Sequence, residues 1–248
     1  MPLPLVLPQL TLPDPLVVAQ SLLQVCQTEV LVEGRQHLPA GAAIVVSNHR
    51  SFLDAPVLIA ALGQPIQLAC HYYLSQVPGL REVALGLGCI PLKQGSRNQV
   101  HFFRAAENQL RQGSSVGLFP EGARRIACAS SPTDVGDFQA GFVHLALKSQ
   151  IRPLPIVPVA IHAQQEWRSW DIPLSVFRWF DVTEPMFQSD GGHPVVIYRQ
   201  VAVRILPPIW MPPEPPTRRQ LLDKADEIAS EIRTQIQAEI QALGELIP

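Results

Sequence analysis

Charged residues are scarce in this sequence. Only 16% of the 248 residues are charged, and the formal net charge is −2. The net charge alone says little about partners, but the basic residues gather in one compact segment (81–125) of a mildly acidic chain. This pattern indicates a local anion site and not a nucleic-acid surface. The four cysteines (Cys26, Cys70, Cys89 and Cys128) form no CxxC pair and have no metal-like spacing. This pattern favours free thiols in a reducing compartment over disulfides or a metal site.

Long hydrophobic runs and a hydrolase signature are also missing. No window of about 18 uninterrupted apolar residues exists, which argues against a membrane-spanning helix. The first residues carry no basic region before their apolar stretch, so they make a poor secretory signal. No GxSxG elbow of a serine hydrolase is present, and Ser47 and Ser51 flank His49 too closely for the usual arrangement of nucleophile and base. The missing membrane span, the poor secretory signal and the free thiols together predict a cytoplasmic protein.

The composition predicts one domain. With 47% hydrophobic residues, the chain can bury one large core, and its 25 prolines cluster in a few stretches typical of turns and edge strands. We divide the chain into a proline-rich start with an amphipathic helix (1–28), a main domain (29–210) and a C-terminal covering helix (211–248). All three parts are expected to belong to one structural domain.

Strand and helix patterns alternate along the main domain. Apolar runs such as "AIVVSN" and "LPIVPVAIH" are separated by amphipathic segments such as "DAPVLIAALG". This alternation predicts an α/β fold, with a mostly parallel or mixed central sheet flanked by helices in a single layered domain.

An uncharged helix is predicted at residues 16–28. Its sequence, "LVVAQSLLQVCQT", places glutamine, serine and threonine on one arc and aliphatic side chains around the rest. Such a helix suits a membrane interface, although interfacial helices usually carry Lys or Arg. Packing on the protein's own core is the alternative.

The stretch "NHRSFLD" brings a histidine and an aspartate into one turn. His49 and Asp54 are five residues apart, so on an ideal helix they would lie about 140° apart and could not pair. They can pair if His49 lies in the turn before a helix whose first turn holds Asp54, a position that "DAP" favours. The carboxylate would then accept from Nδ1–H and leave Nε2 as a general base. A polar loop histidine beside a capping aspartate is the alternative.

The stretch "LFPEGARR", residues 118–125, follows a predicted strand and forms a cationic turn. The whole segment 81–125 holds seven basic and three acidic residues, which indicates a local anion site. Arginine can bind a phosphate through two parallel hydrogen bonds. Glu121 would repel that phosphate unless it is bonded elsewhere, so we assign it an orienting role. Solvated arginines on a surface turn are the alternative.

Taken together, these motifs resemble the lysophosphatidic acid acyltransferase family, the glycerolipid acyltransferases with an NHxxxxD motif. "NHRSFLD" matches the first family motif and "FPEGARR" matches the third, while "IVPVAI" resembles the fourth. "DFQAGFVHLA" resembles the stretch ahead of the fourth motif. The order and spacing agree across residues 29–162.

The resemblance assigns roles to individual residues. It implies that His49 and Asp54 are catalytic and that Glu121, Gly122 and Arg124 bind the acceptor. The second motif departs from the family, because Gln94 stands where the family has an arginine that binds the acceptor phosphate. Two neighbouring side chains, Lys93 and Arg97, are long enough to reach the same anion, but lysine is a point charge and not a fork.

The resemblance implies that a fatty acyl group moves from a thioester to the free hydroxyl of a lysophospholipid, most simply 1-acyl-glycerol 3-phosphate. The donor would be acyl-CoA or acyl-carrier protein, and no metal or redox cofactor is expected. Two rivals stay open: transfer to another acceptor, such as glycerol 3-phosphate or a lysolipid without that phosphate, and a lipid-binding protein without turnover. Intact His49 and Asp54 count against the second rival.

Without a spanning helix, the protein would meet its lipid as a peripheral membrane protein. Besides the 16–28 helix, the segment "EWRSWDIPLSVFRWF", residues 166–180, combines aromatic anchors with arginines. A partly buried element with its tryptophans in the core is the alternative.

Overall fold

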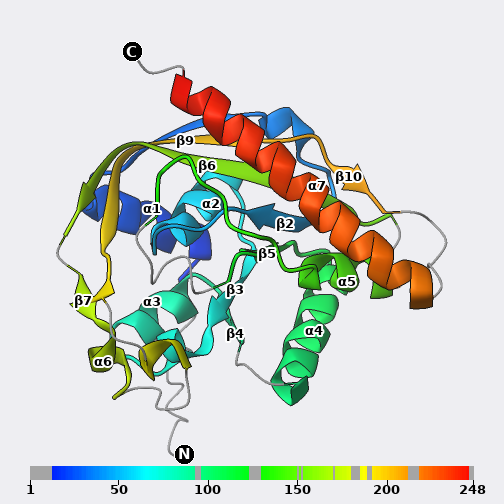
Figure 1. Cartoon of the computed structure of the whole chain (residues 1–248), viewed down its shortest axis with the longest axis horizontal. Coiled ribbons are helices and arrows are strands. Elements are labelled where there is room, and N and C mark those ends of the chain that lie inside the picture. Colours follow the sequence, from blue (N-terminus) through cyan, green and yellow to red (C-terminus); the bar gives the residue numbers. More distant parts are fainter. Residues whose placement is uncertain are drawn as a thin grey trace, which may run out of the picture.

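Short strands rich in valine and isoleucine alternate with helices in the computed structural model, which describes residues 13–92, 96–122, 130–149, 151, 153–169, 171–179, 185–188, 192–211 and 218–245 (Figure 1). Eight of the strands form one sheet in the order β1-β9-β6-β2-β5-β3-β4, with β10 also paired to β6. The bounds of these strands are Glu29–Glu33 (β1), Ile44–Ser47 (β2), Gln67–His71 (β3), Ile90–Leu92 (β4), Val116–Leu118 (β5), Pro155–Arg168 (β6), Val196–Ile205 (β9) and Ile209–Trp210 (β10). Strands β7 (Ile172–Pro173) and β8 (Gly192–His193) form a separate pair.

The helices of the described residues lie between and around these strands. Their bounds are Pro15–Val25 (α1), Asp54–Leu62 (α2), Leu80–Gly86 (α3), Ser96–Arg111 (α4), Gly141–Lys148 (α5), Leu174–Phe177 (α6) and Arg218–Glu245 (α7). Short 3-10 helices occur at Arg35–His37 (η1), Tyr72–Ser75 (η2) and Pro185–Gln188 (η4). The predicted α/β class with flanking helices is confirmed.

The sheet is mixed, as the sequence allowed. Strand β2 pairs in parallel with both β5 and β6, and β3 pairs in parallel with β4 and β5. The antiparallel pairs are β6 with β9 and β10 with β6. Strand β1 runs parallel to β9. The division of the chain at residues 28 and 210 stays a prediction, although α7 packs against β6.

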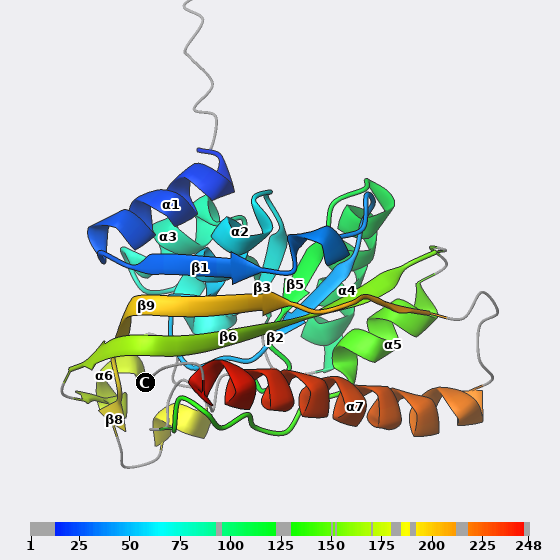
Figure 2. The same ribbon diagram turned by 90° about the horizontal axis from the view of Figure 1, so that it is seen from above.

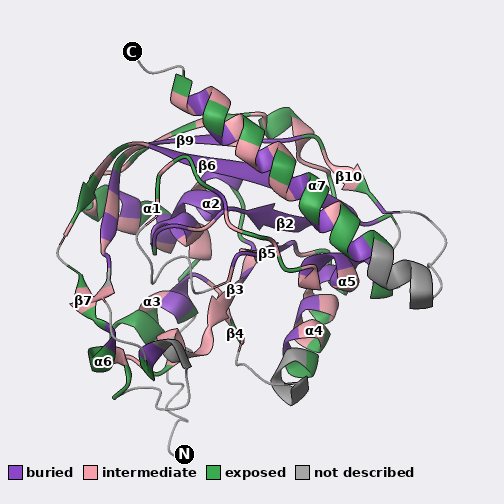
Figure 3. Cartoon of the chain, viewed as in Figure 1, coloured by how far each residue is buried: buried purple, intermediate pink, exposed green. Residues whose placement is uncertain are grey.

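Two cores fill the two faces of the sheet. Along β2, Val45 points into the core beneath α1 and α2, whereas Ile44 and Val46 point into the core beneath α4, α5 and α7. A strand buried on both faces reads as an unbroken apolar run, which is why "AIVV" lacks alternation. Figure 3 shows β2 and β6 buried along their middle, and Figure 2 shows strands β1, β9 and β6 between α1 and α7.

Helix α1 packs on the protein and not with its apolar face outward. Its Ala19 and Leu23 are buried in the core that α2 also fills. Its exposed positions include the polar residues Gln20, Ser21 and Gln24. Val17 and Val25 of the same helix are exposed, at 55% and 81%. The helix therefore packs on the core through one face, and its contact with a membrane stays a prediction.

Strand β6 is longer than its sequence pattern indicated. It continues past the predicted end at His162 to Arg168, where its pairing with β9 shifts register near Gln165. The start of the aromatic 166–180 segment is thus a strand, and Trp167 on it is half-exposed. Trp170 and Phe180 of that segment lie outside the described residues.

The connections on the two sides of β2 diverge at the carboxyl end of this central strand. Strand β2 leads through α2 to β3, while its neighbour β5 leads through α5 to β6 on the other side of β2. The two connections leave in opposite directions and cover opposite faces. Such a switch point opens a crevice at the carboxyl ends of the strands, where α/β proteins place their ligands.

Candidate active site

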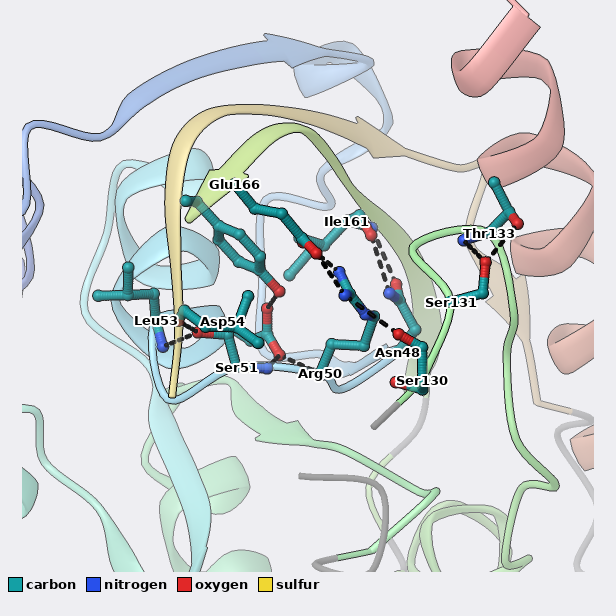
Figure 4. A network of polar contacts seen from close by, with 12 residues as sticks. Asn48, Arg50, Ser51, Leu53, Asp54, Ser130, Ser131, Thr133, Ile161 and Glu166 are labelled. Carbon is teal, nitrogen blue, oxygen red and sulfur yellow. Dashed lines mark hydrogen bonds and ion pairs between the residues drawn. The ribbon is translucent and has the colours of Figure 1, made fainter. Parts of the chain in front are cut away.

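The turn after β2 begins with an asparagine that is bonded to the neighbouring strand. The side chain of Asn48 donates from Nδ2 to the carbonyl of Ile161 and accepts at Oδ1 from the amide of the same residue, both at 2.8 Å. The asparagine side chain thereby continues the pairing of β2 with β6 by one more rung (Figure 4). The next residue, His49, therefore leaves the sheet at a fixed position.

His49 and Asp54 are paired, as the spacing predicted. The Nδ1 atom of His49 lies 2.8 Å from Oδ2 of Asp54, whose side chain is fully buried. Because a carboxylate only accepts hydrogen bonds, Nδ1 carries the hydrogen and Nε2 holds the free lone pair. The His49 side chain is 13% exposed, so this lone pair belongs to a partly accessible ring.

Asp54 stabilises the turn before the helix and not the helix itself. It is the first residue of α2, with Leu53 at the N-cap. Its Oδ2 accepts from the backbone amides of Arg50 at 2.6 Å and Ser51 at 2.7 Å. The carboxylate thus closes the turn that carries His49, which explains why a separation of five residues brings the two side chains together.

The imidazole of His49 is also held from the side of β5. Phe119, the residue after β5, stacks on it with ring centroids 4.1 Å apart and an angle of 13° between the planes. Stacking and the Nδ1 hydrogen bond together fix the plane of the ring and the direction of Nε2.

A tyrosine far along the chain completes the carboxylate's contacts. The hydroxyl of Tyr198 on β9 donates to Oδ1 of Asp54 at 2.7 Å. Burial and the neighbouring Asp54 charge raise the pKa of Tyr198 well above its ordinary value, so the phenol stays protonated. Sequence reasoning missed this residue, since 144 positions separate it from Asp54 and no motif surrounds it.

The two residues after His49 are tied to the long β6 and β9 strands. Arg50 donates to both carboxylate oxygens of Glu166, at 2.6 and 2.9 Å, and to the carbonyl of Ser130 at 3.2 Å (Figure 4). The hydroxyl of Ser51 donates to the carbonyl of Val196 at 2.6 Å. Both side chains are buried and anchor the turn to the two strands.

Glu121 joins the turn after β5 to the turn after β2. Its Oε1 accepts from the backbone amide of His49 at 2.8 Å, and its Oε2 accepts from that of Gly136 at 2.6 Å. The residue is 8% exposed. The adjacent Gly122 has a φ of 72°, which turns the chain sharply away, and its amide donates to the carbonyl of Phe119. Both residues shape the loop beside His49.

The predicted cationic side chains are not placed by the structure. Lys93, Gln94 and Arg124 lie outside the described residues, and the side chain of Arg97 at the start of α4 is likewise not described. Their part in an anion site stays a prediction. Among the described residues, no group of three His, Cys, Asp or Glu side chains is arranged to hold a metal ion.

Comparison with known proteins agrees with this geometry. The acyltransferase family model matches residues 29–162, which include the His49 turn and the Glu121 loop. The match covers more than half of the chain, so the chain belongs to the acyltransferase family.

The names of individual relatives state a substrate as well as a reaction. The chain is 31% identical over 131 residues to the chloroplastic 1-acyl-sn-glycerol-3-phosphate acyltransferase of Arabidopsis thaliana, a match that covers 52% of this chain and 35% of the relative. It is 28% identical over 207 residues to the human 1-acyl-sn-glycerol-3-phosphate acyltransferase alpha, covering 82% of this chain and 61% of that one. The matches thus span less than two thirds of these relatives' length.

A solved structure shares the fold. The crystal structure of the 1-acyl-sn-glycerophosphate acyltransferase PlsC from Thermotoga maritima aligns with a TM-score of 0.56 at 22% identity, over 92% of this chain and 78% of that one. The likeness thus covers more of the chain than residues 29–162, which the family model matches.

Proposed function

We propose that this protein transfers a fatty acyl group from an acyl thioester to the free hydroxyl of 1-acyl-glycerol 3-phosphate, giving phosphatidic acid. The observation that carries the proposal is the hydrogen bond of 2.8 Å between Nδ1 of His49 and the buried carboxylate of Asp54. Membership of the acyltransferase family and the names of the relatives support the same reaction.

His49 acts as the general base in this reaction. Its Nε2 takes the proton from the acceptor hydroxyl while that oxygen attacks the thioester carbonyl. The tetrahedral intermediate then collapses, the carbon–sulfur bond breaks, and the thiol of CoA or acyl-carrier protein leaves with the proton that His49 returns. No acyl-enzyme is required, because the thioester is already activated and alignment of the two substrates with one base suffices.

We infer that basic side chains from the segment 81–125 bind the acceptor phosphate. We assign this role to Arg124 with Lys93 or Arg97, which all belong to the basic stretch between residues 81 and 125. Glu121 and Gly122 shape the turn after β5, and Arg124 follows Gly122 by two residues in the sequence. The support for this assignment is the bonding of Glu121 to two backbone amides, which neutralises part of its repulsion of an anion.

The test is acyl transfer from labelled acyl-CoA and acyl-carrier protein into a panel of acceptors. The panel holds 1-acyl-glycerol 3-phosphate, glycerol 3-phosphate and a lysophosphatidylcholine. His49→Ala and Asp54→Asn should lower the rate by about 10²- to 10⁴-fold, the usual worth of a general base. Asp226→Asn, an exposed position on α7, is the control and should leave the rate unchanged.

A different acceptor is the second candidate, because Gln94 stands where the resemblance leads us to expect an arginine. Transfer only to glycerol 3-phosphate or only to the choline lysolipid would establish it. No transfer to any acceptor from folded wild-type protein would overturn both candidates and leave a lipid-binding role.

We further propose that the protein meets the lipid as a peripheral membrane protein through the end of β6. None of the helices in the described part of the chain has the length and hydrophobicity that a membrane-spanning segment needs. Trp167 and Trp179 are 50% and 86% exposed, and Arg168, the next residue after Trp167, is also exposed and forms an ion pair with Asp171. Exposed tryptophans with a neighbouring cation suit the interface of an anionic bilayer.

Partition onto phosphatidylglycerol-containing vesicles tests this surface. Trp167→Ala should lower the bound fraction, whereas Trp210→Ala should not. Trp210 is a matched control, since it is 53% exposed and lies on β10, which pairs with the opposite end of β6 (Figure 1). Equal effects of the two substitutions would remove the β6 end from the account.

A further inference from the structure

Strand β9 contacts the His49 turn at two points. The carbonyl of Val196 accepts the Ser51 hydroxyl at 2.6 Å, and two residues later the Tyr198 hydroxyl reaches Asp54 at 2.7 Å. Tyr198 is 2% exposed, and among the fully buried side chains it is one of the largest. Strand β9 lies beyond residues 29–162, so these contacts come from outside the region that defines the family.

The donors around Asp54 are unequally shared between its two oxygens. Oδ2 accepts from Nδ1 of His49 and from the amides of Arg50 and Ser51. Within the described residues, the hydrogen bond to Oδ1 comes from Tyr198. A buried carboxylate stays ionised only when such donors replace water on both oxygens. The phenol is therefore the group that satisfies the oxygen facing away from the histidine.

The phenol is suited to this task at any pH at which the protein works. Because its pKa is raised by burial and by Asp54, it donates without titrating. A phenylalanine would fill nearly the same space. The hydroxyl, and not the ring, is thus what a tyrosine contributes at this position.

We propose that Tyr198 is a positioning residue for acyl transfer: its hydroxyl donates to Oδ1 of the buried Asp54 carboxylate and keeps it turned so that Oδ2 meets His49. The proposal rests on the proposed function, since it assigns Tyr198 a part in setting up the same base. Tyr198 acts through Asp54 and touches neither substrate.

Tyr198 could instead have a purely structural role, and the experiment must distinguish that role from positioning of Asp54. Tyr198 is the direct cross-strand partner of Glu166, which binds Arg50. Two cross-strand partners of the antiparallel β6–β9 pair therefore bind the turn through their side chains. If Tyr198 only stabilised the fold of the turn, its hydroxyl would affect stability and the maximal rate but not the pH dependence of the reaction.

The two explanations differ in the pH dependence. Without the phenol, the charge on Asp54 is less stabilised and holds the imidazolium proton more firmly. In Tyr198→Phe, the acidic limb of the kcat/KM profile should therefore shift to higher pH. The KM values for donor and acceptor should change by less than about twofold, because substrate binding is not involved.

A matched control removes a different hydrogen bond from the same tyrosine. The hydroxyl of Thr28 donates to the backbone carbonyl of Tyr198 at 2.7 Å. Thr28→Val removes this bond and leaves the phenol in place, so the pH profile should keep its position. A second variant, 3-fluorotyrosine introduced at position 198, carries a more acidic phenol that donates more strongly, and the acidic limb should move to lower pH.

A measurement without turnover keeps this inference apart from the proposed function. The ring protons of His49, assigned by their loss in His49→Asn, can be titrated by NMR in the wild type and in each variant. If the wild type transfers no acyl group, the proposed function fails while the titration still tests the link from Tyr198 to His49. Superimposable His49 titrations in the wild type, Tyr198→Phe and the fluorotyrosine protein would overturn the inference, whatever the activity.

Discussion

The ion pair between Arg50 and Glu166 should be one of the stronger polar contributions to the stability of this fold. The Arg50 side chain is 7% exposed and that of Glu166 is 22% exposed, and two hydrogen bonds of 2.6 and 2.9 Å join them. The perturbation is Glu166→Gln, which keeps the shape of the side chain and removes its charge. Arg50 would then keep a buried charge with only the Ser130 carbonyl and a neutral amide as acceptors.

The magnitude follows from the exposure of the two side chains. Breaking a fully buried pair costs about 3–5 kcal/mol, because the remaining charge is left without compensation. A fully exposed pair contributes less than about 1 kcal/mol. Arg50 is near the first limit and Glu166 lies between the two, so Glu166→Gln should lower the free energy of unfolding by about 2 kcal/mol.

Urea unfolding followed by tryptophan fluorescence measures this loss. The matched control is Glu107→Gln, which breaks the ion pair with Arg111 on α4, where the side chains are 35% and 51% exposed. Such a pair on a helix surface is worth about 0.3–0.5 kcal/mol. A cycle with Arg50→Met should give a coupling energy near that predicted for Glu166→Gln. The reasoning is refuted if Glu166→Gln destabilises the protein no more than Glu107→Gln.

Two further predictions concern the rest of the fold. Gly34 has a φ of 83°, and a Cβ there would lie 2.1 Å from the Ile205 carbonyl oxygen, so Gly34→Ala should cost at least about 2 kcal/mol of unfolding free energy. Gly41→Ala, with no atom within 4 Å of the added Cβ, should stay within about 0.5 kcal/mol of the wild type, and equal losses would contradict this account. Burial lowers the pKa of His162, so the unfolded chain binds its proton more readily and the unfolding free energy should fall as pH drops from about 7 to 5. His162→Gln should flatten that decline, and the exposed His101→Gln should not; a decline unchanged in His162→Gln would speak against the assignment.

The pairing of His49 with Asp54 could be predicted because both ends lie in one local turn. The apolar run before His49 and the helix pattern after Asp54 fixed where the strand and helix meet, and the hydrogen bond follows from that junction. The alternation of strands and helices likewise predicted the layered α/β fold.

The long-range part of the site could not be predicted in the same way. Which oxygen of Asp54 meets Tyr198, and which acid meets Arg50, depends on the register of β6 against β9. That register includes a shift at Gln165, and a change of one residue would turn Glu166 to the other face of the sheet. The sequence gives no sign of the shift, because Gln164, Gln165 and Glu166 are all polar and show no alternation that would mark the register.

The hydrogen bond from Tyr198 also has a consequence for how the protein is made. Translation proceeds from the N-terminus, so Asp54 leaves the ribosome 144 residues before the tyrosine that binds its Oδ1. A nascent chain that has reached only β6 holds the whole region matched by the family model and yet lacks one donor to the buried carboxylate. Contacts of such long sequence separation form late in folding. The base is therefore completed only when β9 has been made and joins the sheet.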